Sequence, residues 1–237
     1  MKKFIIIFWL AASVNAIGQQ DFFKPYTDSI KLVEDANIIV SDFTSRVNAI
    51  EFVMANQPRS IMNTRPFLIF YSPKSNVVNL PLWEQVMPAQ KDFFYRLAGD
   101  SIEGRELFGL FFNGFYLPHE LGHALQNFAK RNKFNLYEGE YFANVIAILY
   151  WRKMNRITEL EQCYNYAKQI VGKLPDPVPE GEDPENYFNE HYAELGADPS
   201  KYGYFQFAQF VKIYEDKSLP GFDEFVKKYL EREDVLR

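Results

Sequence analysis

Two of the three histidines of this chain lie four residues apart, at His119 and His123, and Glu120 follows the first in FYLPHELGHALQ (115–126). Residues four apart lie on one face of an α-helix, so both imidazole rings can direct a nitrogen at the same point. Zinc binds histidine nitrogen at roughly 2.0–2.1 Å in tetrahedral geometry, and catalytic sites add a third protein ligand and water. The spacing predicts a helix that carries two metal ligands and needs a third from elsewhere. The alternative is two histidines that only share a helical face.

A second helical stretch, YEGEYFANVIAILYWR, offers the missing ligand. Glu140, Ala143, Asn144 and Ala147 fall on one helical stripe, and the two alanines would let a neighbouring helix approach closely. We therefore expect Glu140 to be the third metal ligand, whereas Glu138 is turned about 200° away and faces solvent near the helix N-terminus. Asn144 either holds a ligand histidine by its other ring nitrogen or is an amide that packs between helices.

These residues carry a resemblance to a known family. The sequence His119-Glu120-Leu121-Gly122-His123, followed by Glu140-Tyr141-Phe142-Ala143-Asn144, resembles the gluzincin zinc metallopeptidases, whose third ligand is a glutamate on a downstream helix. The resemblance covers about residues 104–153 and implies Zn²⁺, peptide hydrolysis and Glu120 as general base toward a water that zinc acidifies to a pKa of about 7. A metzincin is disfavoured, because Ala129 stands where its third histidine would be.

Hydrolysis also needs a donor to the oxyanion that forms at the substrate carbonyl. Candidates lie in the segment NEHYAELGADPSKYGYFQF, namely His191, Tyr202 and Tyr204. Gluzincin-like enzymes often place a Tyr or His from a C-terminal helical part against the zinc. The chain has 15 tyrosines, so the alternative for each tyrosine is ordinary core packing.

The N-terminal segment MKKFIIIFWLAASVNA has the pattern of a secretory signal peptide. Lys2 and Lys3 precede an apolar run that ends at small residues, and the run is about half as long as the ~20 residues of a membrane-spanning helix. We expect cleavage near Ala16, export to the periplasm or the medium, and no stable membrane insertion after cleavage. Loss of both lysines changes the net charge from −5 to −7, which argues against nucleic acid or an anionic membrane as partner.

The remaining sequence, 17–237, predicts one mainly helical α+β domain. The apolar periodicity indicates helices at 25–57, 88–100, 104–131 and 137–153, and a further helix that follows and ends at about 171. Helical segments are also expected around 185–195, 200–216 and 222–233. Pro118 either kinks the 104–131 helix or begins a new one. Two strands are expected, Phe67–Tyr71 and Val77–Leu80, as a small sheet or hairpin; either strand could bind an extended substrate or be an ordinary half-buried strand. The segment 173–186 is expected to be an exposed proline-rich acidic loop, and Cys163, the only cysteine, a buried structural thiol.

Together these features favour an exported zinc metallopeptidase with a zincin-like fold that acts on a peptide or protein substrate. Two alternatives stay open: a zinc hydrolase with a non-peptide substrate, and a secreted binding domain that keeps the fold without catalysis. An intact Glu120 argues against the binding domain, because a purely structural metal site needs no general base. The sequence does not indicate an oligomeric state.

Overall fold

A computed structural model describes residues 21–65, 67–131, 133–232 and 235–236, and the predicted signal peptide lies outside them. The described part is mainly helical with a small sheet, as the α+β prediction required. Its α-helices are α2 (Ser29–Ile50), α3 (Pro88–Ala98), α4 (Ser101–Phe108), α5 (Tyr116–Ala129), α6 (Leu136–Lys153), α7 (Ile157–Lys173), α8 (Pro184–Ala197), α9 (Pro199–Glu215) and α10 (Phe222–Leu230). None of these helices is long and apolar enough to span a bilayer.

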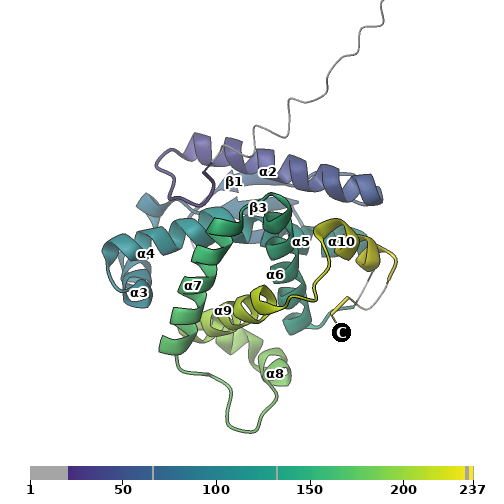
Figure 1. Cartoon of the computed structure of the whole chain (residues 1–237). Coiled ribbons are helices and arrows are strands. Elements are labelled where there is room, and N and C mark those ends of the chain that lie inside the picture. The colour runs from purple at the N-terminus through teal and green to yellow at the C-terminus, as the bar shows by residue number, and fades with distance from the viewer. Residues whose placement is uncertain (1–20, 66, 132, 233–234, 237) are drawn as a thin grey trace, which may run out of the picture.

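The sheet has three strands: β1 (Arg59–Met62), β2 (Phe70–Ser72) and β3 (Val77–Leu80). The order is β1-β3-β2, with β1 parallel and β2 antiparallel to the central β3. The predicted strand at Val77–Leu80 is confirmed, and the strand expected from Phe67 begins only at Phe70. In Figure 1, α2 lies along the sheet at one side of the molecule, and α8 and α9 lie at the opposite side.

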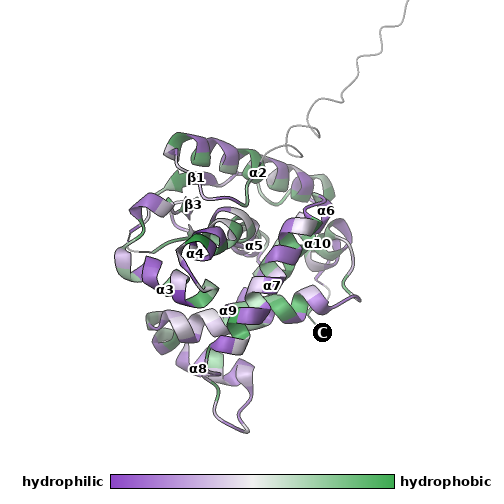
Figure 2. Cartoon of the chain, turned by 60° about the vertical axis from the view of Figure 1, so that its left-hand side comes forward, coloured by the Kyte–Doolittle hydropathy of each residue, from purple (hydrophilic) through white to green (hydrophobic). Residues whose placement is uncertain are grey.

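The predicted helix over 25–57 is shorter in the structure, because Asp28 caps its start and its end comes at Ile50. The Asp28 carboxylate accepts hydrogen bonds from the first free backbone N–H groups, which fixes the beginning of α2. Its buried residues follow one face, and in Figure 2 the helix carries both hydrophobic and hydrophilic residues. The chain then runs to β1, a strand that the sequence did not predict.

The helix with the histidines is continuous with the segment before it. α4 passes into a π-helical segment, Gly109–Phe115, and this passes directly into α5, with Pro118 as its third residue. Proline has no backbone N–H, and its ring would clash with the carbonyl four residues back in a regular α-helix. The wider π-turn relieves that conflict, so the chain neither breaks nor restarts at Pro118.

The C-terminal helices build a second wall around α6. α9 packs on both α6 and α7, and α8 packs on α6 and α9. A small cluster of Phe188, Leu195 and Phe205 joins α8 to α9, and Val178 of the loop between α7 and α8 packs against it. That loop corresponds to the predicted proline-rich segment and is otherwise largely exposed. Cys163 is a buried free thiol, as expected.

Candidate metal centre

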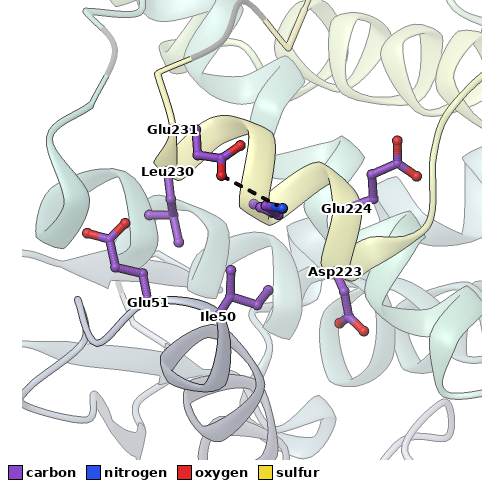
Figure 3. Close-up of a pocket in the computed structure, with 7 residues that line it drawn as sticks. Ile50, Glu51, Asp223, Glu224, Leu230 and Glu231 are labelled. Atoms are coloured by element: carbon purple, nitrogen blue, oxygen red, sulfur yellow. Dashed lines mark ion pairs between the residues drawn. The ribbon is translucent and has the colours of Figure 1, made fainter.

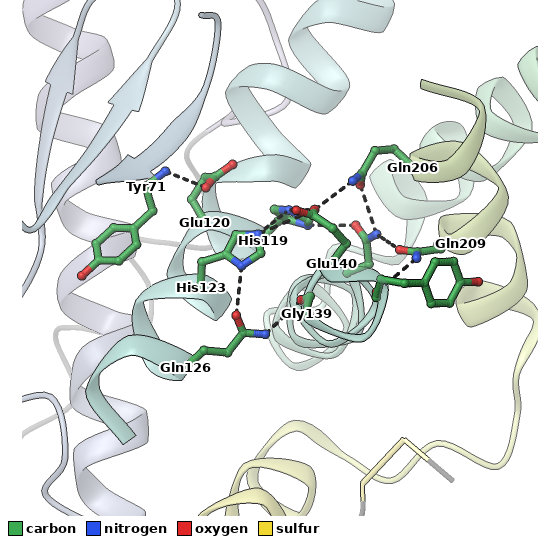
Figure 4. Close-up of polar contacts among 11 residues, drawn as sticks. Tyr71, His119, Glu120, His123, Gln126, Gly139, Glu140, Gln206 and Gln209 are labelled. Carbon is green, nitrogen blue, oxygen red and sulfur yellow. Dashed lines mark hydrogen bonds and ion pairs between the residues drawn. The ribbon is translucent and has the colours of Figure 1, made fainter. Parts of the chain in front are cut away.

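Three side-chain atoms meet between α5 and α6. The Nε2 atoms of His119 and His123 are 3.2 Å apart, and Oε2 of Glu140 lies 3.3 Å from the first and 3.7 Å from the second. Ligands held at roughly 2.0–2.1 Å from a tetrahedral zinc ion lie about 3.4 Å from one another. The triangle therefore has the size of one face of a zinc coordination tetrahedron, and the group could hold a metal ion (Figure 4).

Close approach of the two helices brings Glu140 to the histidines. Gly122, between the histidines, faces Ala143 so closely that an added Cβ would lie 2.9 Å from the Ala143 Cα. The absence of a side chain at Gly122 and the methyl group of Ala143 allow α5 and α6 to cross here. This contact is the one expected from the alanine stripe of α6, with Gly122 as its counterpart on α5.

The tautomer of His123 follows from its neighbours. Gln126 Nε2 donates a hydrogen bond to the backbone carbonyl of Gly139 at 2.9 Å, so its Oε1 faces Nδ1 of His123, 3.0 Å away. A carbonyl oxygen can only accept, and Nδ1 must therefore carry a proton. The Nε2 atom is left to face the metal centre.

A longer chain of amides fixes His119 in the same way. Its Nδ1 lies 2.9 Å from Oδ1 of Asn144, while Nδ2 of Asn144 donates to Oε1 of Gln206 and of Gln209 at 3.2 and 3.0 Å. Gln206 donates from Nε2 to the Glu140 carboxylate at 2.8 Å, and Gln209 donates to the Tyr137 carbonyl at 3.4 Å. Both end groups are pure acceptors, so every amide orientation in the chain is determined and His119 carries its proton on Nδ1.

Glu140 and His123 shift each other's pKa values toward their charged forms. Burial by itself raises the pKa of Glu140, but attraction to His123 and contacts with both imidazoles outweigh it and hold the pKa well below its usual range. Burial by itself lowers the pKa of His123, and the Glu140 carboxylate more than reverses this, raising the pKa to about 9. Without a metal, a proton on Nε2 of His123 therefore stands where a metal ion would stand.

Glu120 lies on the side of His119 that faces the sheet, opposite Glu140 (Figure 4). Its carboxylate is buried and accepts a 2.7 Å hydrogen bond from the backbone N–H of Tyr71 on the edge strand β2. Burial is the main cause that raises the pKa of Glu120, while the two histidines and the Tyr71 N–H act in the opposite direction. β2 is further attached to α5, because Asn127 donates to the Tyr71 hydroxyl at 3.2 Å.

The three candidates for the oxyanion donor lie in different surroundings. The pKa of Tyr202 is raised well above its usual value, first by burial and then by the charges of Glu140 and Glu120. Tyr204 donates a 2.8 Å hydrogen bond to Asp176 in the loop before α8. His191 is paired with Glu194 on α8 at 3.8 Å. Of the three, Tyr202 has a pKa that responds to the carboxylates of the centre, whereas Tyr204 and His191 contact acidic residues elsewhere.

Sequence reasoning missed several polar groups that hold the ligands: Gln126, Gln206 and Gln209. It also missed Tyr192, whose pKa is raised by burial and, to a lesser degree, by Glu140 and Glu120. The sequence held a signal for two of these glutamines, because Gln206 and Gln209 are polar residues three apart on the otherwise apolar segment Phe205–Phe210.

A surface pocket lies away from this centre. It has a volume of about 430 Å³ between the end of α2 and α10 (Figure 3). Its lining is Ile50, Glu51, Asp223, Glu224, Lys227, Leu230 and Glu231. Four of its seven lining residues are acidic, and none of the seven belongs to the metal centre.

The sequence matches no protein family model and no curated protein, and the structure matches no solved structure. The resemblance to gluzincins therefore stays a prediction from the sequence motif.

Proposed function

We propose that this chain is a zinc-dependent metallopeptidase in which His119, His123 and Glu140 hold the metal. The observation that carries the proposal is the triangle of three ligand atoms, whose edges of 3.2, 3.3 and 3.7 Å fit tetrahedral zinc. Two neutral imidazoles and one carboxylate are also a ligand set found in catalytic zinc sites, where a fourth place stays open for water.

Zinc held by these residues would act as a Lewis acid and lower the pKa of a water molecule to about 7. A hydroxide nucleophile would then be available to attack a carbonyl near neutral pH. Glu120 is suited to receive the proton, because its raised pKa brings it nearer to the working pH. It then delivers the proton to the leaving amine. Tyr202 would be the donor to the oxyanion: a tyrosine hydroxyl is protonated at neutral pH, and here the pKa is raised further.

A peptide substrate is favoured by the position of β2. This strand is at the edge of the sheet, and its Tyr71 N–H points to Glu120 rather than to β3. An extended peptide that adds to this edge would run past the proposed general base. A zinc hydrolase that acts on small esters or amides remains the second candidate, because the metal centre and Glu120 would serve it equally well.

The test begins with the metal content of purified protein. We expect about one zinc per chain in the wild type and little in His123→Ala, which loses one of three ligands. Equal zinc in both proteins would remove the basis of the proposal.

The second part of the test is turnover of a peptide library alongside small esters and amides. Glu120→Gln keeps the ligands and the size of the side chain but cannot accept a proton, so we expect full zinc and a loss of rate of about 10²–10⁴-fold. Cleavage of small esters alone would favour the non-peptide hydrolase. Zinc without any turnover would favour a binding domain.

We also propose that the mature protein is exported. Lys2, Lys3 and the apolar run before Ala16 support this. Expression of the full sequence in a bacterial host, followed by mass measurement of the periplasmic and secreted fractions, should give a chain that begins near residue 17. Recovery of the uncleaved chain in the cytoplasm alone would contradict the export.

A further inference from the structure

We infer that Gln206 and Gln209 of α9 are positioning residues of the metal centre: they hold the Glu140 carboxylate and, through Asn144, the His119 ring in the arrangement that binds metal. This inference rests on the proposed zinc site, because it concerns the residues that support its ligands. It assigns a role in that site to α9, a helix that supplies none of the three proposed ligands.

Gln206 contacts the centre at both ends of its amide. Its Nε2 donates to Oε2 of Glu140 at 2.8 Å, and this is the oxygen nearest to both imidazoles. A carboxylate oxygen has two lone pairs, so it can accept from the amide with one and offer the other to a metal. The hydrogen bond thereby fixes the direction in which Glu140 presents its free lone pair.

The other end of Gln206 acts on His119. Its Oε1 accepts from Nδ2 of Asn144, and Oε1 of Gln209 accepts the second proton of the same nitrogen. With both protons placed, Asn144 must turn its Oδ1 toward Nδ1 of His119, which then holds a proton there and presents Nε2 to the metal. If His119 carried its proton on Nε2 instead, its bare Nδ1 would face Oδ1 of Asn144. That buried oxygen would then lack a donor, which costs free energy.

Packing alone does not explain two glutamines here. Gln206 and Gln209 are 6% and 2% exposed, and their neighbours on α9 are Phe205, Phe207 and Phe210. A buried amide without partners costs free energy that an apolar side chain would not, so a helix that only packs would be served better by Leu or Met. In both glutamines the donor and the acceptor are engaged, and three of the four hydrogen bonds lead to Glu140 or, through Asn144, to His119.

The experiment compares three glutamine variants of the full chain. Gln206→Met keeps the length of the side chain and removes both hydrogen bonds. Gln209→Met removes one acceptor of Asn144 and the donor to the Tyr137 carbonyl, and it leaves Gln206 and its bond to Glu140 in place. Gln169→Met is the matched control, because Gln169 is exposed on α7 and donates only to the Ala98 carbonyl, 3.4 Å away.

The first readout is zinc affinity, measured by competition with a chromophoric chelator. Loss of a group that orients a metal ligand typically weakens binding 10–100-fold. We expect a loss of roughly this size for Gln206→Met, a smaller loss for Gln209→Met and no change for Gln169→Met. Circular dichroism and thermal melting establish that each variant is folded, and Gln206→Leu replaces Gln206→Met if methionine is not accommodated.

The second readout is the tautomer of His119, observed by NMR of zinc-loaded protein with ¹⁵N-labelled imidazoles. In the wild type we expect a slowly exchanging Nδ1–H from both ligand histidines. In Gln206→Met the signal of His119 should broaden or be lost while that of His123, which Gln126 holds, is retained. If Gln206 had only a packing role, its loss would not affect the Nδ1–H signal of His119 while leaving that of His123 unchanged.

The outcomes separate the two proposals. A wild-type protein that takes up no zinc contradicts the proposed function itself. A wild type that binds zinc, together with a folded Gln206→Met of equal affinity and unchanged His119 signal, overturns the inference about α9 and leaves the proposed function standing.

Discussion

His123 lies where a proton and a metal ion compete for the same nitrogen. The Glu140 carboxylate raises the pKa of His123 from 6.5 to about 9, so the metal-free protein holds this proton at neutral pH. Glu140 itself has a pKa well below 4.5 and releases no proton in this range. Zinc binding must therefore release one proton from His123, and the apparent affinity should fall about tenfold per pH unit below pH 9. Calorimetric titrations in buffers of different ionisation enthalpy measure this proton; an affinity that is constant from pH 6.5 to 8.5 would contradict it.

At the same scale, the sequence predicted the three residues that the structure brings together better than the groups that support them. The four-residue spacing of His119 and His123, and the stripe that Glu140 shares with Ala143, both express helical periodicity, which is local and can be recognised in one chain. The role of Asn144 stayed open between two alternatives, and its 2.9 Å contact with His119 identifies it as a support of that ring. Gln206 escaped prediction because its partner Glu140 is 66 residues away, and no local pattern encodes that contact.

At the scale of elements, the crossing of α5 and α6 sets the size of the centre. An alanine at Gly122 would place its Cβ 2.9 Å from the backbone of Ala143, which cannot move without displacing α6. We expect Gly122→Ala to destabilise the fold by about 1–3 kcal/mol. The better helix propensity of alanine, about 1 kcal/mol, offsets only part of this loss. The two helices should also separate, so zinc affinity should fall together with stability in urea denaturation and chelator competition.

The control for this prediction is Gly172→Ala on α7, where an added Cβ meets nothing within 4 Å. It should leave zinc affinity unchanged and stability equal or slightly higher. If Gly122→Ala is as stable as the wild type and binds zinc equally well, the helix crossing is not the constraint that we describe.

Elements with non-local partners were also the hardest to predict. β1 is four residues long, and its pattern of exposure follows from parallel pairing with β3 and from packing against α2, neither of which is visible in its own residues. The continuity of the helix through Pro118 was one of two alternatives, since a proline signals a local conflict but not whether a π-turn resolves it. The long amphipathic helices, by contrast, follow from periodicity alone.

At the scale of the whole molecule, the centre joins three helices that are separate in the sequence. α5 and α6 supply the three candidate ligands, and α9 contacts Glu140 and Asn144 without contributing one. A metal that binds only the folded state stabilises it by about 2.7 kcal/mol at a free concentration of 100 times the dissociation constant. Hydrogen exchange should locate this gain: amides of α5, α6 and α9 should exchange more slowly with zinc, and those of α3, which contributes nothing to the centre, should change least. Protection confined to α5 and α6 would show that α9 is a neighbour of the centre rather than a part of it.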